Sequence, residues 1–363
     1  MWILYWLPKG ISEKVAKLCR ASWQTRRFAP PFRKFLLAIT LIFLLLVELA
    51  PAGAAEVSKI SRLQEFHGMC SASGAVALDD NHFAVADDEG NQIRIYHNQR
   101  EGKPVSILDL NSFLELDPRH GEADLEGAAR VGQLVYWIGS HSRNPEGKLR
   151  LNRHRFFATQ IELKKRKATL TPIGRPCKDL LAQLVAEPKF KTLRFAEAAS
   201  LPPKSPGALN IEGLAAAPNG SLIIGFRNPI PDGNALLVPL LNPEEVIAGK
   251  KARFGEALHV DLGGLGIRDF AYSEAGYVIV GGHADGQGHS KLFHWSGGAK
   301  PPETVEVKHF KQFNPEAVII YPRFGLERIQ ILSDDGGVRE DGRRCKDLPN
   351  PDDRIFRSFW VKP

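Results

Sequence analysis

The sequence lacks the motifs that are typical of zinc-binding and redox-active cysteine proteins, nucleotide-binding proteins and serine esterases. Only four of its 363 residues are cysteine, and no two are spaced as Cys-x-x-Cys, which argues against a zinc ribbon or a thioredoxin-like motif. The phosphate-binding and dinucleotide-binding patterns GxxxxGK(S/T) and GxGxxG are absent, and so is the Gly-x-Ser-x-Gly motif of serine esterases. These absences disfavour a nucleotide-dependent enzyme and a serine esterase.

A large excess of one charge is also missing from most of the chain. The net charge is +7, but residues 1–34 hold eight bases and one acid, so the other residues hold 40 bases and 40 acids. This neutral part has no basic stripe with interleaved aromatic residues, and we therefore expect no nucleic-acid partner. With 43% hydrophobic and 25% charged residues, the chain should fold into a globular protein.

The basic N-terminal segment is followed by an uncharged run, Phe35 to Val47, that is too short to span a bilayer comfortably. Small residues follow at positions 50–55. This order predicts a signal peptide and leader at residues 1–55, cleavage before Glu56, and a mature domain at residues 56–363. We expect a periplasmic or secreted protein without a membrane partner after cleavage. The alternative is an uncleaved N-terminal membrane anchor, because the basic segment is unusually long.

One short phrase recurs five times, and each copy opens an apolar run that is followed by a second apolar run with a polar tip. The copies are Ser73-Gly74-Ala75-Val76, Glu126-Gly127-Ala128-Ala129, Glu212-Gly213-Leu214-Ala215, Arg268-Asp269-Phe270-Ala271 and Glu316-Ala317-Val318-Ile319. Repeats of this size are typical of propellers and solenoids. The sequence predicts an all-β, five-bladed β-propeller with four antiparallel strands in each blade.

Two irregularities complete the predicted architecture. The copies are 53, 86, 56 and 48 residues apart, and the long gap contains a helical pattern at Cys177 to Val185 and a proline-rich loop. We interpret residues 176–208 as a helical insertion between blades two and three; a sixth, degenerate blade is the alternative. The fifth blade is one strand short, and we expect Val57 to Phe66 to supply that strand and close the ring.

Antiparallel strands place the loop before the first strand of a blade and the loop after the second on the same face. Ionisable residues of both loops should therefore surround one mouth of the central channel. Clustered carboxylates suit a hard divalent cation, calcium or another, and the predicted ligands are Glu126, Glu212, Glu316 and Asp269. The predicted substrate-binding residues are Arg143, Arg227, Arg268, His283, Asp87 and Asp88. His141 or Asp334 would activate water.

Structural interpretations of the same residues stay open. The arginines could neutralise the glutamates directly. A Glu-Gly pair at the start of a strand could be a blade-forming device, in which the carboxylate accepts backbone hydrogen bonds and glycine permits the bend. Asp87 and Asp88 could belong to an ordinary turn, and His141 and His283 could be hydrogen-bonded structural residues.

Three cysteines lie in the mature region, where export would permit a disulfide. Cys70 precedes the first blade and Cys345 follows the second strand of the fifth, so both should lie on the site face of adjoining blades. We predict a Cys70–Cys345 disulfide. A Cys177–Cys345 bond is the rival, suggested by the matching segments Cys177-Lys178-Asp179-Leu180 and Cys345-Lys346-Asp347-Leu348.

Several motifs carry a family resemblance over nearly all of the mature chain. They are Asp124-Leu125-Glu126-Gly127-Ala128-Ala129-Arg130, Tyr136-Trp137-Ile138-Gly139-Ser140-His141, Gly225-Phe226-Arg227-Asn228-Pro229, Gly263-Gly264-Leu265-Gly266-Ile267-Arg268-Asp269 and Leu332-Ser333-Asp334-Asp335-Gly336. Through them the chain resembles a family of exported bacterial β-propeller proteins catalogued as a domain of unknown function. This membership implies no established activity.

A looser similarity rests on the phrases Asp124-Leu125-Glu126-Gly127 and Asn210-Ile211-Glu212-Gly213 alone. In them the chain is similar to the esterase-like phytase propellers, which would imply a phosphoester substrate. No catalytic residue is transferred from that similarity, because a shared fold does not carry function.

Two functions follow as hypotheses. The first is a divalent-metal-assisted hydrolase of a phosphoester or a lactone, with its site at the channel mouth. The second is a propeller that binds a ligand or a protein without turnover. In both, we expect a small anionic or carbohydrate-like ligand and a monomeric protein.

Overall fold

The computed structural model describes residues 62–164, 167–307, 310–311, 313–337 and 342–363. These described residues form one compact unit. The predicted signal peptide and leader, at residues 1–55, lie outside the described residues. In the part that is described, no helix has the length and apolar character needed to cross a membrane.

Short apolar runs between turn residues form five four-stranded antiparallel sheets, as the repeats predict. The first blade contains β2 (Ala72–Ala77), β3 (His82–Asp87), β4 (Gln92–His97) and β5 (Ser106–Asp109). The second contains β6 (Leu125–Val131), β7 (Leu134–Gly139), β8 (Phe156–Lys164) and β9 (Lys167–Cys177). The third contains β10 (Asn210–Ala216), β11 (Leu222–Asn228), β12 (Ala235–Leu240) and β13 (Leu258–Val260).

The remaining two blades follow the same plan. The fourth contains β14 (Gly266–Ser273), β15 (Gly276–Gly282), β16 (Lys291–Trp295) and β17 (Glu303–Val305). The fifth contains β18 (Pro315–Ile320), β19 (Ile329–Ser333), β20 (Ile355–Val361) and β1 (Gln64–His67).

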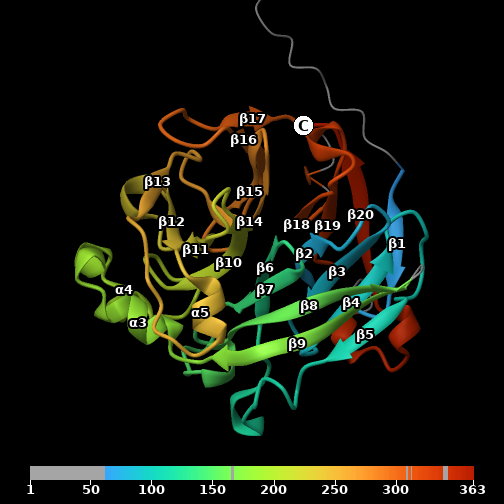
Figure 1. The fold of residues 1–363 in the computed structure, drawn as a ribbon, viewed down its shortest axis with the longest axis horizontal. Helices are drawn as coiled ribbons and strands as arrows, with labels where there is room; N and C mark the ends of the chain where they lie inside the picture. The colour runs from blue at the N-terminus through green and yellow to red at the C-terminus, as the bar shows by residue number, and fades with distance from the viewer. Residues whose placement is uncertain (1–61, 165–166, 308–309, 312, 338–341) are drawn as a thin grey trace, which may run out of the picture. The chain divides into compact units, whose positions relative to one another are not determined.

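The first strands of the blades surround the centre of the ring (Figure 1). Strands β2, β6, β10, β14 and β18 contact one another in that order, and β18 contacts β2, which closes the circle. Between each pair of adjacent blades the described residues form a large hydrophobic cluster, and Cys70, Cys345 and Leu348 form a small sixth one where blade five meets blade one. The core is therefore divided among the blade interfaces, and burial of these clusters holds the inner strands in register around one axis.

The ring closes as predicted, with an N-terminal strand completing the last blade. Strand β1 pairs antiparallel with β20, where Gln64 lies opposite Ser358 and Phe66 opposite Phe356. The Trp360 indole N–H donates to Gln64 Oε1 over 2.8 Å. The predicted strand began at Val57, and its first residues lie outside the described part of the chain.

The insertion is also confirmed. Between β9 and β10 the chain forms α3 (Leu180–Ala186), a 3-10 helix (Pro188–Leu193) and α4 (Phe195–Ala198) rather than a sixth blade. A further short helix, α5 (Pro243–Ile247), follows β12. The leucines of α3 pack into the cluster between blades two and three, and the Phe195 ring stacks on Phe226 with centroids 5.4 Å apart. Other 3-10 helices in the described part are Pro118–His120, Leu151–Arg153, Pro231–Gly233, Gly325–Glu327, Cys345–Asp347 and Pro351–Asp353.

The predicted disulfide joins Cys70 to Cys345, with Cα atoms 6.1 Å apart. It links the segment before β2 to the loop between β19 and β20, next to the seam where the ring closes. Cys177 is a free, buried cysteine, so the rival pairing with Cys345 is wrong.

Candidate functional site

Each of the five inner strands contains a β-bulge at the recurring phrase. In β6, for example, Leu125 lies opposite Gly139 and Gly127 opposite Ile138, so Glu126 is the extra residue. The register also shifts at this phrase in β2, β10, β14 and β18, with a second shift in β10 between Asn210 and Ile211. A bulge re-aims a side chain and is common beside active sites. We call the residues at the five bulges the ring residues: Ser73, Glu126, Glu212, Arg268 and Glu316.

In blades one to three the residue after the ring residue is a glycine, and the closeness of the neighbouring strand explains why. A Cβ atom on Gly74 would lie 2.6 Å from the carbonyl carbon of Gly127, and one on Gly127 would lie 2.9 Å from the amide nitrogen of Leu214. At Gly74 and Gly127 the neighbouring inner strand therefore lies too close for a larger side chain. The phrase thus combines both interpretations offered by the sequence: its glycine shapes the blades, and the residue before it faces the channel mouth.

All five ring residues line one cavity of about 420 Å³, which we call the polar mouth. Asp88, Asp124, Arg153, Lys204, Arg227 and Asp334 also line it. Residues distant in sequence therefore meet at one opening, as the predicted circular arrangement requires. Of the residues proposed from the sequence, Asp88, Glu126, Glu212, Arg227, Arg268, Glu316 and Asp334 belong to this cavity.

Arginines neutralise the acids on the side of blades three to five. Arg227 Nη1 lies 2.5 Å from Glu212 Oε1, and Arg268 Nη2 is paired with Glu316 Oε2. All four residues are at least nine-tenths buried. Burial opposes the charge of Arg227, but the neighbouring Glu212 carboxylate raises its pKa overall. Glu212 and Glu316 are thus already compensated by arginine, which was the structural interpretation of these residues.

The opposite side of the cavity holds carboxylates with little compensation. Oxygen atoms of Asp88, Asp124 and Glu126 all lie within 4.8 Å of one another, and we call these residues the acidic trio. Ser73 Oγ donates to Glu126 Oε2 over 2.6 Å, and Arg153 Nη1 lies 2.9 Å from Asp124 Oδ2. Asp88 Oδ1 is buried without a hydrogen-bond partner in the described structure. Three carboxylates therefore share one arginine, which Glu122 also contacts over 2.6 Å.

The electrostatic consequence is a set of strongly perturbed carboxyl groups. Burial, followed by the charges of neighbouring carboxylates, raises the pKa of Asp88 and of Glu126 well above their usual values. Burial also raises the pKa of Asp124, although Arg153 opposes the shift. A bound cation would remove this repulsion. Clusters with such shifts are frequent at functional sites.

A comparison of the blades shows why the negative charge collects at blade two. Two residues before the ring residue, blades three and five carry Asn210 and Asn314, whereas blade two carries Asp124. Asn210 Nδ2 donates to Glu212 Oε1 over 2.8 Å, and Asn314 Oδ1 accepts from Arg268 Nη1 over 2.7 Å. The equivalent position in blade two is acidic, so it adds a carboxylate beside Glu126 instead of a neutral amide.

A cationic corner lies on the cavity wall near Gly286. A Cβ atom added there would lie 3.1 Å from Arg227 Nη2 and 3.3 Å from Lys204 Nζ, so both nitrogens approach one point. Lys204 comes from the proline-rich loop of the insertion and is exposed. The cavity therefore offers carboxylates on one side and two converging positive groups on the other.

Three of the residues predicted to bind ligand or activate water have structural contacts instead of lining the cavity. Asp87 accepts from Arg94 Nη1 over 2.6 Å within the first blade. His141 is buried, with Nδ1 2.8 Å from the Gly139 carbonyl oxygen. Arg143 donates to the carbonyls of Ala199 and Gly147 and so ties the insertion to blade two.

Two more predicted residues lie outside the polar mouth. Asp269 occupies the glycine position of its phrase, is 2% exposed, and accepts from the Val318 amide over 2.8 Å. Its carboxylate bridges blades four and five and does not join the acidic trio. His283 is exposed, and its carbonyl oxygen accepts from Arg227 Nε over 2.9 Å.

Sequence reasoning did not assign Asp124, Arg153 or Lys204. The one signal for Asp124 was its place two residues before Glu126, which had been assigned. Arg153 and Lys204 come from loops distant in sequence, and no spacing pattern indicates that they reach the cavity.

The fold and the cavity together define a five-bladed β-propeller with an ionisable site at one mouth of its channel. The chain belongs to the family described as "Protein of unknown function (DUF3616)", which matches residues 72–155 and 147–323. This confirms the resemblance found in the sequence. No curated protein matches the chain.

Solved structures of other proteins are similar at low identity. Glutaminyl cyclase from Myxococcus xanthus is 13% identical, with a TM-score of 0.41, over 76% of this chain and 90% of that one. The allergen Mala s 1 from Malassezia sympodialis is 8% identical, with a TM-score of 0.48, over 82% and 96%. Aldose sugar dehydrogenase from Streptomyces coelicolor is 14% identical, with a TM-score of 0.38, over 84% and 98%. Similarity at such low identity and TM-score says nothing about the site.

Proposed function

We propose that the polar mouth binds a divalent cation at the acidic trio and hydrolyses a small anionic phosphoester or lactone with its help. The observation that carries this proposal is the trio itself: three partly buried carboxylates whose oxygens lie within 4.8 Å, with one Asp88 oxygen lacking a partner in the described structure. A hard cation such as calcium takes oxygen ligands of this kind.

The donor set fits the proposed cation. Asp88, Asp124 and Glu126 offer carboxylate oxygens only, which favours calcium, magnesium or manganese over softer metals. One cation would compensate most of the charge that raises the pKa values of Asp88 and Glu126. When bound, such an ion polarises a phosphoryl or carbonyl oxygen and lowers the pKa of water.

The chain's own residues have separate roles in this scheme. Lys204 and Arg227 bind the anionic group of the substrate at the cationic corner. Asp334 lines the cavity, and burial raises its pKa, so it can hold or accept a proton at Oδ2. Asn314 Nδ2 donates to that oxygen over 3.2 Å and orients it. Of the two groups predicted to activate water, we assign the role to Asp334, because His141 does not line the cavity.

Hydrolysis assays test the proposal directly. We would incubate the protein with p-nitrophenyl phosphate, bis(p-nitrophenyl) phosphate and dihydrocoumarin, each with calcium, magnesium or manganese and with a chelator. Turnover should require a cation, and Asp124→Asn should reduce kcat on the order of 100-fold. Lys204→Gln should raise KM more than it lowers kcat, because it removes binding of the anion.

Glu274→Gln is the matched control, since Glu274 is an exposed acid at the other mouth. It should leave turnover unchanged. Turnover that survives both the chelator and Asp124→Asn, or no turnover of any substrate with any of the cations, would count against a metal-assisted hydrolase.

Ligand binding without turnover is a second candidate. Arg268 is committed to Glu316 and Asn314, and Arg227 uses Nη1 and Nε on Glu212 and the His283 carbonyl. This leaves few mobile groups for catalysis. Calorimetry with phosphate or a sugar phosphate, with and without calcium, would favour this function if binding occurs in a protein that hydrolyses none of the substrates above.

Export remains part of the proposal. The Cys70–Cys345 disulfide supports a periplasmic or secreted location, because such bonds persist in oxidising compartments. Mass spectrometry of the protein recovered from its native host should find an N-terminus near Glu56; a retained residue 1 would support the membrane-anchor alternative.

A further inference from the structure

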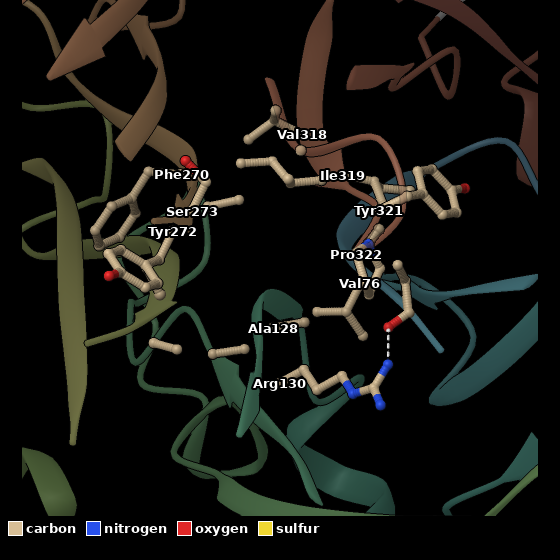
Figure 2. A pocket seen from close by; sticks show the side chains of 18 of the residues that line it. Val76, Ala128, Arg130, Phe270, Tyr272, Ser273, Val318, Ile319, Tyr321 and Pro322 are labelled. Carbon is tan, nitrogen blue, oxygen red and sulfur yellow. Dashed lines mark hydrogen bonds between the residues drawn. The ribbon is translucent and has the colours of Figure 1, made fainter. Parts of the chain in front are cut away.

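The opposite mouth of the channel holds a second cavity of about 740 Å³, which we call the apolar basin (Figure 2). Its wall begins one residue after the close-packed level of the inner strands, at Ala75, Ala128, Leu214, Phe270 and Val318. The polar mouth ends one residue before that level, at the ring residues. The two cavities share no lining residue, so the basin is separate from the site already described.

Small side chains keep the basin hollow. Alanines 75, 77, 128, 129, 215, 216 and 271 line it, drawn from four of the five inner strands. Figure 2 shows Val76, Ala128 and Val318 around an open centre, with the rings of Phe270 and Tyr321 behind the wall on opposite sides. Both rings are buried in the blade interfaces. The large residues thus stiffen the wall and the small ones define the space.

The charged residues at the basin offer little to a charged ligand. Arg130 presents its aliphatic stem, while Nε donates to the Gly132 carbonyl over 2.9 Å and Nη1 to the Leu78 carbonyl over 2.7 Å. Glu327 Oε2 lies 3.2 Å from Lys362 Nζ, and Glu274 is exposed at the rim. The larger part of the wall is therefore apolar, and its Arg130 guanidinium is turned to backbone carbonyls.

We propose that the apolar basin binds one uncharged, hydrocarbon-rich small molecule. Ligand pockets typically enclose about 300–1,000 Å³ and are lined mainly by apolar side chains with a few polar groups. The basin meets this description in volume and lining. Its concave shape, built from the five inner strands, distinguishes it from a flat apolar face. Because the charged residues at the basin offer little to a charged ligand, the basin favours a neutral ligand over an anionic or cationic one.

Two measurements test the proposal with the whole protein. Titration with N-phenyl-1-naphthylamine, an uncharged dye that fluoresces in apolar surroundings, should show one saturable site. Ala128→Trp and Ala271→Trp, which fill the basin from two different blades, should each weaken binding by at least roughly tenfold. Leu163→Ala is the matched control, because Leu163 is an exposed apolar residue of β8 outside the basin, and it should leave the affinity unchanged.

Photolabelling of the wild-type protein locates the site without relying on a variant. Benzophenone, an uncharged diaryl ketone, should attach within residues 270–275 or within the segment 318–327, which supplies eight lining residues of the basin. Absent saturable dye binding, equal loss of affinity in Leu163→Ala, unchanged affinity in folded Ala128→Trp and Ala271→Trp, or labelling confined to other segments would each overturn the proposal. Dodecyl sulfate or dodecyltrimethylammonium displacing the dye more strongly than 1-dodecanol would overturn the neutral class of ligand.

Discussion

Replacing Asp88 by asparagine should change thermal stability in opposite directions with and without a divalent cation. In the cation-free protein the acidic trio has oxygens within 4.8 Å. Two full charges at that distance repel by about 3.5 kcal/mol at an effective dielectric constant of about 20. Partial protonation and solvent relieve much of this repulsion, so we expect Asp88→Asn to stabilise the cation-free protein by about 1 kcal/mol at about pH 8.

The pH dependence has a definite sign. A carboxyl group whose pKa is raised by folding binds more protons in the folded state than in the unfolded state. Its contribution to stability is therefore lost as the pH rises above the pKa that the group has in the unfolded chain. Because burial and neighbouring charges raise the pKa of Asp88 and of Glu126, the melting temperature of the cation-free protein should fall between about pH 5 and about pH 8. Asp88→Asn should reduce that fall.

Scanning calorimetry with chelator and with excess calcium provides the assay. A gain of about 1 kcal/mol corresponds to a rise of about 2 °C for a domain of this size. Calcium at about 100 times its Kd should stabilise the wild type by about 2.7 kcal/mol and the variant much less. Glu89→Gln is the control, since this adjacent acid lines the same cavity but is exposed, lies outside the acidic trio and is 2.7 Å from Lys346. Our reasoning is refuted if Asp88→Asn lowers the melting temperature at both pH values and keeps the full response to calcium.

Three further predictions concern buried ionisable groups. Glu212→Gln leaves the Arg227 charge buried and unpaired, and should reduce the free energy of unfolding by about 3 kcal/mol in urea titrations; no loss would contradict the pairing. Burial raises the pKa of the Cys177 thiol to about 12, so iodoacetamide at about pH 8 should label it, by mass spectrometry, only after unfolding. Burial lowers the pKa of His141 to about 3 and that of its stacked neighbour His154 to about 4. Both stay neutral when folded, so the contribution of this pair to stability should fall as the pH drops from about 6.5 to about 4, and His141→Asn should reduce that contribution, measured as the difference between variant and wild type in calorimetric scans.

The fold was predictable because its determinants are local and repeated. Apolar runs separated by turn residues specify strands, and five copies of one phrase specify five blades. Even the closing strand followed from a simple count, because the fifth blade lacked one strand and β1 had no blade of its own. The disulfide followed from the same topology, which places Cys70 beside Cys345.

For the site, the sequence predicted only which positions face the channel mouth. The ring residues could be read from the phrase, because a bulge at the same place in each inner strand gives them the same direction. Asp269 shows the limit of this reasoning: it stands at the glycine position, and comparison of the copies would have indicated that it packs between blades.

The distribution of charge around the mouth could not be read from the sequence. Whether a glutamate is paired with arginine depends on side-chain directions across blades, as with Arg268, which reaches Glu316 of the next blade. Lys204 and Arg153 reach the cavity from loops whose paths have no repeating pattern. The separation into a compensated side and an acidic side is therefore a property of the three-dimensional structure.

The most direct test of the central claim is a crystal structure grown with manganese and measured at a wavelength where manganese scatters anomalously. The account predicts one strong anomalous peak at the polar mouth, within coordination distance of Asp88, Asp124 and Glu126. No peak there at millimolar manganese, or a peak held by other residues while these three carboxylates remain unliganded, would contradict it.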